Sequence, residues 1–347
     1  MRSSCLALVV VSIAFCSCQS APVVPASWRM LPTACDASLR GLSAVDANVA
    51  YVSGSGGTVL RTEDGGKTWQ DVAPSGTENC DFRDIEALDH DQVVAMVAGQ
   101  PARVYRSDDA GQNWQLVHED PRKEAFFDAI AFAGDVGMMF GDAIDGQFCM
   151  LQSNDGGRTW HDRSGVMLPA PGVGEAAFAA SGTCLVAADE DAAVFSLVTG
   201  GGPTRVITFG PSVTAASGAH HWCQWLPLQD GASSKGAFSV AFCGARGVAV
   251  GGNYSDPGAT NETVATTCDG GITWIPGDAG GFRSAVVWLD EHSLLSVGSH
   301  GASWSSDEGS TWQAFGEVGF HCLSKGRDGS VWASGSDGRI ARLVTVP

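Results

Sequence analysis

The amino-acid sequence predicts an all-β protein, a seven-bladed β-propeller whose blades are four-stranded sheets joined by tight turns. Three observations favour this class. A short motif of Asp, Gly and Trp recurs along the chain, most of its copies are about one blade apart, and glycine makes up 45 of the 347 residues. That glycine share is about double the usual one and suits a chain with many tight turns. A ring of repeats also lets a chain of this length fold without one oversized core.

The recurring motif reads Ser/Thr-x-Asp-x-Gly-x-Thr/Asn-Trp and occurs five times. Its acidic residues are Asp64, Asp109, Asp155, Asp269 and Asp307, and its tryptophans are Trp69, Trp114, Trp160, Trp274 and Trp312. The Asp can accept backbone N–H groups within a turn, and the Gly supplies a conformation that other residues resist. We therefore expect each motif, called an Asp box below, to be a structural hairpin whose Trp packs between neighbouring sheets. One carboxylate per box is too few for calcium, which takes six to eight oxygens.

The spacing of the boxes predicts the number of blades. The box tryptophans are separated by 45, 46, 114 and 38 residues. The long interval has room for one blade without a box, with residues 194–197 as its third strand and 200–202 as its turn, followed by an insertion at about 210–236. After the last box, residues 319–344 hold three strand-like runs and no fourth.

The missing fourth strand is expected near the N-terminus, because residues 27–31 resemble the stretch that follows the first box. This strand would complete the last blade, close the ring and leave no sheet edge exposed. Six or eight blades stay open as alternatives. The predicted blades are 39–72, 82–117, 126–162, 174–208, 237–276, 281–315, and 319–344 together with 27–32.

Residues 1–20 have the composition of an export signal, with Arg2 as the only charge and a short apolar run over 6–15. A run of ten residues is too short to cross a hydrocarbon core of roughly 30 Å, which favours a signal peptide over a membrane anchor. Two processing routes stay open. An imperfect lipobox would make Cys18 the lipidated first residue, and the alternative is ordinary cleavage near Ser20.

The expected organisation is a signal peptide at 1–20, a short linker at 21–26 and the propeller at 27–347. The expected location is the periplasm or, through a lipid, the outer membrane, with secretion as an alternative. The chain is expected to be a monomer. Its formal net charge is −18, from 38 acidic and 20 basic residues. Such a surface repels nucleic acids and anionic lipids, so we expect no nucleic-acid partner, and membrane contact only through the lipid.

The sequence offers no motif for a cofactor or a metal. It has no GxGxxG turn opening a helix and no CxxCH haem site, so oxidoreductase activity is unsupported and no cofactor is expected. The adjacent His220 and His221 would point in opposite directions on an extended chain, which disfavours a shared metal. Cys35 and Cys80 are the best candidates for a disulfide, because each precedes an Asp just before the first strand of neighbouring repeats.

Residues 56–69 read Gly-Gly-Thr-Val-Leu-Arg-Thr-Glu-Asp-Gly-Gly-Lys-Thr-Trp. This stretch resembles the repeat of the photosystem II assembly and stability factor family, whose relatives occur in non-photosynthetic bacteria as well. The resemblance covers nearly the whole chain after the leader, except the degenerate fourth blade and residues 210–236. It implies an exported seven-bladed propeller that holds partner proteins and is not a catalyst. The resemblance names no partner for this chain.

Asp boxes also occur in sialidases, so a hydrolase of acidic glycans is the main alternative function. That family carries an early Arg-Ile-Pro signature, three arginines that grip a carboxylate, and a Tyr nucleophile. Arg-Ile-Pro is absent here, and Tyr51, Tyr105 and Tyr254 occupy no recognisable catalytic context. No residue is therefore assigned a catalytic role.

The candidate site is the mouth of the central channel. First strands line this channel, so the residue after the leading hydrophobe of each first strand should face one ring, as Ser239 after Phe238 does in blade 5. Residues that follow the second strands of blades 3 and 5 should join them. The full set is Arg40, Arg83, Asp128, Asp142, Asp145, Glu175, Asn253, Tyr254, Arg283 and His321.

Three arginines at the channel mouth could clamp a carboxylate or phosphate, and the acids with His321 could act as acid and base. The alternative is a set of Arg–Asp pairs that only tie blades together. We therefore expect an exported scaffold that presents its channel mouth or one face to an envelope protein or a small anionic ligand. Trp222 and Trp225 would offer a further contact surface.

Overall fold

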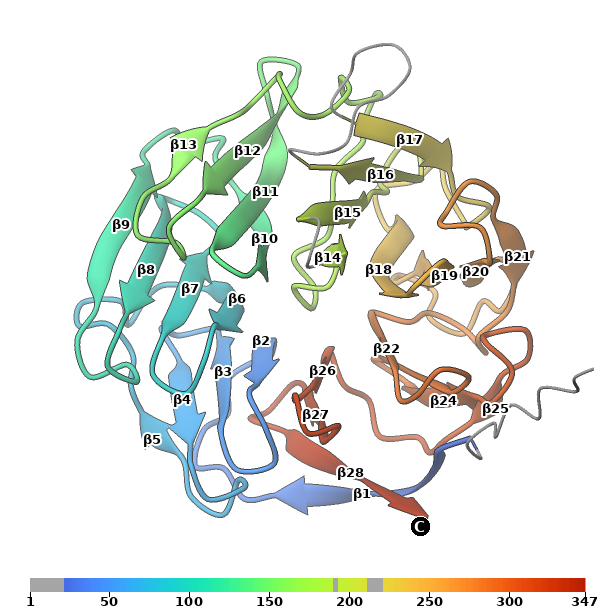
Figure 1. Ribbon diagram of the computed structural model, residues 1–347, viewed down its shortest axis with the longest axis horizontal. Helices are drawn as coiled ribbons and strands as arrows, with labels where there is room; N and C mark the ends of the chain where they lie inside the picture. The colour runs from blue at the N-terminus through green and yellow to red at the C-terminus, as the bar shows by residue number, and fades with distance from the viewer. Residues whose placement is uncertain (1–21, 190–192, 211–220, 347) are drawn as a thin grey trace, which may run out of the picture.

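A computed structural model describes residues 22–189, 193–210 and 221–346. These residues form seven four-stranded antiparallel sheets arranged as a ring around a central channel (Figure 1). The predicted fold class is confirmed. From the channel outward, blade 1 is β2 (Leu39–Ala44), β3 (Ala50–Gly54), β4 (Val59–Thr62) and β5 (Gln70–Asp71); blade 2 is β6 (Phe82–Ala87), β7 (Val93–Val97), β8 (Ala102–Ser107) and β9 (Gln115–Asp120); blade 3 is β10 (Phe127–Ala133), β11 (Val136–Ile144), β12 (Gln147–Ser153) and β13 (His161–Asp162).

The remaining blades continue around the ring in chain order. Blade 4 is β14 (Leu185–Asp189), β15 (Val194–Val198), β16 (Arg205–Phe209) and β17 (His221–Trp225); blade 5 is β18 (Lys235–Cys243), β19 (Arg246–Asn253), β20 (Val264–Thr267) and β21 (Ile275–Gly277); blade 6 is β22 (Ala285–Trp288), β23 (Leu294–Gly298), β24 (Gly301–Ser305) and β25 (Gln313–Ala314); blade 7 is β26 (Cys322–Lys325), β27 (Val331–Ser334), β28 (Ile340–Val346) and β1 (Val24–Leu31).

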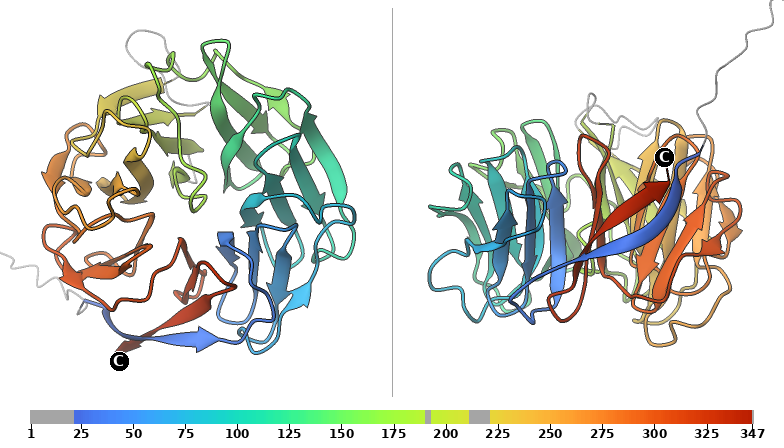
Figure 2. Two further views of the ribbon diagram at one scale, coloured as in Figure 1. Left: turned by 180° about the vertical axis from the view of Figure 1, so that it is seen from behind. Right: turned by 90° about the horizontal axis from the view of Figure 1, so that it is seen from below.

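The ring is closed by the N-terminal strand, as predicted. β1 pairs antiparallel with β28 along its whole length, so the first and last strands of the ring share one sheet (Figures 1 and 2). On this strand, the Trp28 ring centroid lies 4.9 Å from that of Phe320 and 5.7 Å from that of Phe315. The closing strand therefore packs a partly buried aromatic side chain between blades 6 and 7 and also completes the backbone pairing.

Blade 4 differs from the prediction. Residues 194–197 lie in the second strand, β15, and the third and fourth strands are β16 and β17. Part of the stretch expected to be an insertion, 210–236, is thus the outermost strand of the blade. The mistake arose because blade 4 has no Asp box to mark the turn between its third and fourth strands. Residues 211–220, which include His220, lie outside the described part of the chain.

Several other predictions concern residues that the structure does not describe or does not pair. The predicted signal peptide at 1–20, with the lipidation candidate Cys18, lies outside the described residues and stays a prediction. Within the described ranges, no helix has the length and apolar character needed to span a membrane.

Cys35 and Cys80, the predicted disulfide pair, are both free thiols. They lie on opposite sides of blade 1, because Cys35 packs in the core shared with blade 7 and Cys80 in the core shared with blade 2.

The Asp boxes form the hairpins that were predicted. In blade 3, Asp155 accepts hydrogen bonds from the backbone N–H groups of Arg158 (3.0 Å) and Thr159 (2.9 Å) and from the hydroxyls of Thr159 (2.6 Å) and Ser153 (2.8 Å). Burial raises the pKa of Asp155, but these hydrogen bonds outweigh it and bring the pKa down to about 2. Closely similar bonds recur at the other four boxes. The carboxylate oxygens are therefore used up inside the turn, in keeping with a structural role.

Neighbouring blades are tied together along the channel by a repeated contact. A short polar side chain on one first strand accepts a hydrogen bond from a backbone N–H of the next first strand. These bonds run from Ala44 to Ser324 (2.9 Å), from Ala87 to Ser43 (3.0 Å), from Ile130 to Asp84 (2.8 Å) and from Val286 to Ser239 (3.1 Å). Because Asp84 is buried, its pKa rises to about 7. Hydroxyl and buried carboxyl groups thus tie these inner strands, and not the predicted Arg–Asp pairs.

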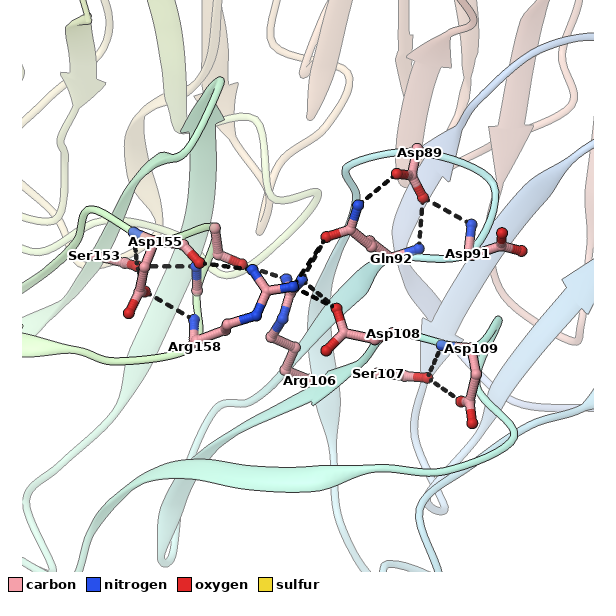
Figure 3. Close-up of polar contacts among 12 residues, drawn as sticks. Asp89, Asp91, Gln92, Arg106, Ser107, Asp108, Asp109, Ser153, Asp155 and Arg158 are labelled. Carbon is pink, nitrogen blue, oxygen red and sulfur yellow. Dashed lines mark hydrogen bonds and ion pairs between the residues drawn. The ribbon is translucent and has the colours of Figure 1, made fainter.

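Blades 2 and 3 share a second tie on the Asp-box face (Figure 3). The buried Arg106 on β8 donates to Gln92 (2.6 Å), to Asp108 (2.5 Å) and to the carbonyl of Gly156 in the next box. Arg158, from that next box, donates to the same Asp108 at 2.9 Å. Two arginines from neighbouring blades therefore share one carboxylate, and we call this contact the box brace.

The box brace should contribute measurably to stability through Arg106 and much less through Arg158. Replacing Arg106 by Leu leaves the buried carbonyl of Gly156 without the donor that it has in wild type, which should cost about 1–3 kcal/mol of unfolding free energy. Arg158→Leu is the matched control, because this side chain is 51% exposed and that of Arg106 is 2% exposed. Exposed ion pairs contribute about 0–1 kcal/mol. Urea unfolding followed by tryptophan fluorescence measures both, and equal losses would contradict the assignment.

Candidate binding pocket at the channel mouth

A pocket of about 380 Å³ lies at one end of the channel, on the face opposite the Asp boxes. Strand pairing in blade 1 shows that the pocket and the Asp boxes lie on opposite faces of the ring. Leu39, at the start of β2, pairs with Gly54, whereas the other end of β3 pairs with Thr62, where the box begins. The polar and aromatic residues that line the pocket are Arg40, Arg83, Asp128, Asp142, Ser284, Ser299, His321, Tyr254, Phe126, Phe178, Phe238 and Phe282.

A β-bulge at the start of the first strand presents side chains to this pocket. In blades 1, 2, 3 and 5 the first strand carries one extra residue opposite the second strand. The extra residues are Arg40, Arg83, Asp128 and Phe238. A bulge re-aims the side chain that it contains, and all four of these side chains line the pocket.

The predicted register is one residue off in blades 5 and 6. The extra residue of blade 5 is Phe238, not Ser239. In blade 6 the N–H of Arg283 donates to the carbonyl of Gly251 at 3.0 Å, as the N–H of Leu39 in blade 1 donates to Gly335. Arg283 therefore stands at the position of Leu39, and its neighbour Ser284 takes the place of Arg40.

Arg283 is consequently buried inside its blade and does not line the pocket. It is 4% exposed and donates to the carbonyls of Phe282 (2.9 Å) and Gly280 (3.1 Å) and to the hydroxyl of Ser303 (2.6 Å). Burial lowers its pKa to about 10. The predicted trio of arginines is thus a pair, Arg40 and Arg83.

A glycine at the end of the second strand is the sequence signal that would have predicted which first-strand residue of each blade faces the pocket. Added Cβ atoms at Gly54, Gly251 and Gly298 would lie 2.4, 1.9 and 2.2 Å from a backbone carbonyl oxygen at, or just before, the start of the first strand of the same blade. Only glycine allows this close approach between the two strands. Aligning the blades on this glycine, instead of on the leading phenylalanine, puts Phe238 and Ser284 in the ring.

Three other predicted residues also lie away from the pocket. Glu175 is buried and forms an ion pair with Arg205, with a distance of 2.5 Å between Nη2 and Oε2. Asp145 is exposed in the turn between β11 and β12. Asn253, at the end of β19, accepts a hydrogen bond from the N–H of Ser255 at 3.0 Å. Trp222 and Trp225 belong to β17, the outermost strand of blade 4, so they lie on the rim of the ring.

The two arginines of the pocket differ in their partners. Arg83 donates to Asp81 at 2.6 Å and to the carbonyl of Ala179 at 3.1 Å. The guanidinium of Arg40 has no hydrogen-bond or ion-pair partner among the described residues. Burial lowers the pKa of Arg40, and the charge of Arg83 lowers it further. Arg40 is therefore a half-buried cation whose donors are available to a ligand.

The acidic side of the pocket is a carboxyl pair, Asp128 and Asp142. Burial raises the pKa of Asp142 to about 6. Asp128 is 1% exposed, and burial together with the nearby Asp142 raises its pKa well above the usual range, against the opposing charge of Arg83. One oxygen of each carboxyl has no protein partner. Asp128 thus favours its protonated form, and the pair leaves unused polar atoms in the pocket.

His321 is the remaining titratable group that borders the arginines. Its Nε2 lies 3.0 Å from the hydroxyl of Ser336 and 3.4 Å from that of Ser38. Burial lowers the pKa of His321 to about 4, and the charges of Arg40, Arg339 and Arg83 add to this effect. The imidazole is therefore neutral at neutral pH and offers a hydrogen bond without a charge.

The opposite wall is aromatic and was missed in the sequence. Phe178 stacks on Phe238 with ring centroids 3.8 Å apart, and Phe282 meets Phe238 edge-on at 4.8 Å. Tyr254, which is 50% exposed, stands edge-on to Phe178 and Phe238. These rings come from blades 5 and 6 and from the chain leading into blade 4. The pocket thus has a polar side formed by blades 7, 1, 2 and 3 and an apolar side.

Comparisons with known proteins agree with this architecture. Residues 21–126, which cover β1 and the first two blades, match the model of the family described as photosynthesis system II assembly factor YCF48. The predicted family is confirmed over these residues. No match was found among curated proteins.

Solved structures show the same fold along the whole chain. A structure of YCF48 bound to D1 peptide superposes with a TM-score of 0.66 at 17% identity, over 94% of this chain and 100% of the other. YCF48 from Cyanidioschyzon merolae gives 0.58 at 18%, over 92% and 99%. A streptogramin B lyase gives 0.65 at 10%, over 92% and 97%. At these identities the likeness establishes the fold alone.

The raised pKa of Asp142 predicts a pH-dependent contribution to stability. Its folded pKa of about 6 exceeds the unfolded value of about 3.9, so the folded state binds more protons between these values. The free energy of unfolding should therefore fall as pH rises through this window, by on the order of 2 kcal/mol. Asp142→Asn should reduce this fall by that amount and leave the part that comes from other buried carboxyls such as Asp84.

Urea unfolding across this pH window measures the difference between wild type and variant. Asp145→Asn is the matched control, because it makes the same change on the same hairpin at an exposed residue. A wild-type pH slope that persists unchanged in Asp142→Asn would show that Asp142 titrates normally.

Proposed function

We propose that this chain is an exported binding propeller that holds a segment of a partner protein at the channel mouth. The segment presents an acidic group to Arg40 and Arg83 and an apolar side chain to the aromatic wall. The observation that carries this proposal is Arg40, a half-buried guanidinium that lines the pocket and has no partner of its own among the described residues. A buried cation of this kind is stabilised by an anionic ligand with forked hydrogen-bonding geometry.

The dimensions of the pocket favour a protein segment over a whole domain as the ligand. A volume of about 380 Å³ accommodates one or two side chains. The rest of the partner would lie on the surrounding loops, which belong to the same face. The solved structure of YCF48 with D1 peptide supports the proposal, because it shows that a propeller of this fold binds a peptide. The leader at 1–20 supports export, to the periplasm or, through Cys18, to the outer membrane.

A hydrolase of acidic glycans is the second candidate function, and one observation favours it. Asp128 and Asp142 are two carboxyls with raised pKa values in the same pocket as the arginines. A proton-holding carboxyl next to an ionised one is a precondition for acid–base hydrolysis. Tyr254 lines the same pocket. The binding experiment below is arranged to separate the two functions.

Binding should require both the acidic and the apolar part of the ligand. The probes are short fluorescent peptides with a Glu beside a Phe, with matched peptides in which Glu is replaced by Gln or Phe by Ala. Wild type should bind the parent peptide at least about tenfold more tightly than either matched peptide. Arg40→Gln with Arg83→Gln should abolish that preference for Glu, as measured by fluorescence anisotropy.

The control variant removes two arginines elsewhere, Arg103→Gln with Arg158→Gln, and should bind as wild type does. Peptide binding that survives the loss of Arg40 and Arg83 would place recognition outside the pocket. Turnover of an acidic oligosaccharide by wild type, lost in Asp128→Asn, would establish the hydrolase instead.

A further inference from the structure

A second cleft, of about 480 Å³, lies where the ring is closed, on the Asp-box face of the molecule. One wall is the closing strand β1, which runs beside β28 at the rim of the ring (Figure 1). The other wall is the Asp box of blade 1 with the neighbouring Asn48. The cleft therefore joins the seam between blades 7 and 1 and lies on the face opposite the channel-mouth pocket.

Three cations line this cleft: Arg29 on β1, Arg342 on β28 and Lys67 in the Asp box. Arg29 and Arg342 are direct partners across the antiparallel pair. Like charges directly opposite each other destabilise a sheet. Burial lowers the pKa of Arg342, and the charge of Arg29 lowers it further. The two guanidiniums are thus held together against their repulsion.

Arg342 is fixed in place by contacts other than a carboxylate. Its Nη1 donates to the carbonyl of Ala47 at 2.8 Å, and its guanidinium lies over the ring of Trp332, 4.9 Å from the centroid. These contacts position the charge, and the nearby carboxylates of Asp328 and Asp46 favour it without forming an ion pair with Arg342. In the described part of the chain, Arg29 and Lys67 make no ion pair.

The acid that lines the cleft is ionised but forms no ion pair with these cations among the described residues. Asp64 accepts hydrogen bonds from the N–H groups of Lys67 (2.9 Å) and Thr68 (2.9 Å), and from the hydroxyls of Thr68 (2.7 Å) and Thr62 (3.0 Å). The bonds from Thr68 lead the others in lowering the pKa of Asp64 to about 2. Its oxygens are therefore directed into the turn.

The grouping is unusual for a chain with 38 acidic and 20 basic residues. Eight arginines elsewhere form ion pairs with carboxylates, namely Arg61, Arg83, Arg103, Arg106, Arg122, Arg158, Arg205 and Arg246. With so many carboxylates available, the three cations of the cleft still lack an ion-paired carboxylate among the described residues, which leaves their donors open to an external anion.

We propose that this seam cleft binds a phosphate group. Arg29 and Arg342 supply two forked sets of donors and Lys67 a point charge, which together match a tetrahedral dianion. The phosphate belongs either to a soluble phosphate or to a lipid headgroup. This site is independent of the peptide pocket, because the two share no residue. A bound phosphate would also relieve the repulsion between Arg29 and Arg342 and so stabilise the closing strand.

Inorganic phosphate is the first probe, with binding measured by isothermal titration calorimetry on the mature chain. The test variant is Arg29→Gln with Lys67→Gln, because both side chains are exposed and their loss leaves the contacts of Arg342 intact. The control variant, Lys123→Gln with Lys235→Gln, removes the same charge away from the cleft. Wild type and control should bind phosphate, and the test variant should bind at least about tenfold more weakly. Added salt should weaken wild-type binding.

The second arm distinguishes the two sources of phosphate. Vesicles of phosphatidylglycerol and of phosphatidylcholine are sedimented with each protein. Pelleting of wild type, but not of the test variant, with phosphatidylglycerol alone identifies a lipid headgroup, whereas phosphate binding without pelleting identifies a soluble phosphate. Circular dichroism checks that each variant is folded, and Lys67→Gln alone replaces the double variant if it is not. Absence of phosphate binding to wild type, or equal binding by test and control variants, overturns the proposal.

Discussion

The pairing of β1 with β28 is the constraint on which the rest of the molecule depends. It joins strands from opposite ends of the chain into one blade, and it gives this blade the same four strands as the other six. The channel-mouth pocket requires this closure, because His321 comes from blade 7 and Arg40 from blade 1. Until the last strand has been made, the first has no partner, so the site can form only in the complete chain.

A strongly acidic chain places two arginines in its pocket and controls the charge of some of their neighbours through burial. Burial favours the protonated form of Asp128 and the neutral form of His321, so neither side chain adds a full charge beside Arg40. The aromatic rings opposite exclude water and strengthen the field of the arginines. Position within the ring therefore changes the charge that individual side chains carry, in a way that the composition does not reveal.

The fold could be predicted almost completely, because each Asp box marks the turn between the third and fourth strands of its blade. The box geometry depends on residues within one turn, so it can be recognised locally. Blade 4 lacks a box, and there the prediction assigned residues 194–197 to the wrong strand. The closing strand was found because residues 27–31 repeat the pattern that follows a box.

The site could be predicted only in part, since it depends on which residue of the first strand is bulged. Arg40, Arg83, Asp128 and His321 were placed correctly at the pocket by counting from a buried hydrophobe. In blades 5 and 6 the hydrophobe itself is displaced, and counting from it selected Ser239 and Arg283. The position of the bulge depends on how closely the first and second strands approach each other. The glycine at the end of the second strand therefore predicts the bulged residue better than the phenylalanine near the start of the first strand does.

The bulge also separates the specificity of the pocket from the stability of the blade. The side chain that it carries is not matched to a single partner residue on the second strand, so its size and charge are free to vary. Blades 1, 3 and 5 show the range, with Arg40, Asp128 and Phe238 at equivalent places in blades of the same architecture. Substitutions at these few positions give the scaffold a route to new ligands during evolution, with little disturbance of the ring that supports them.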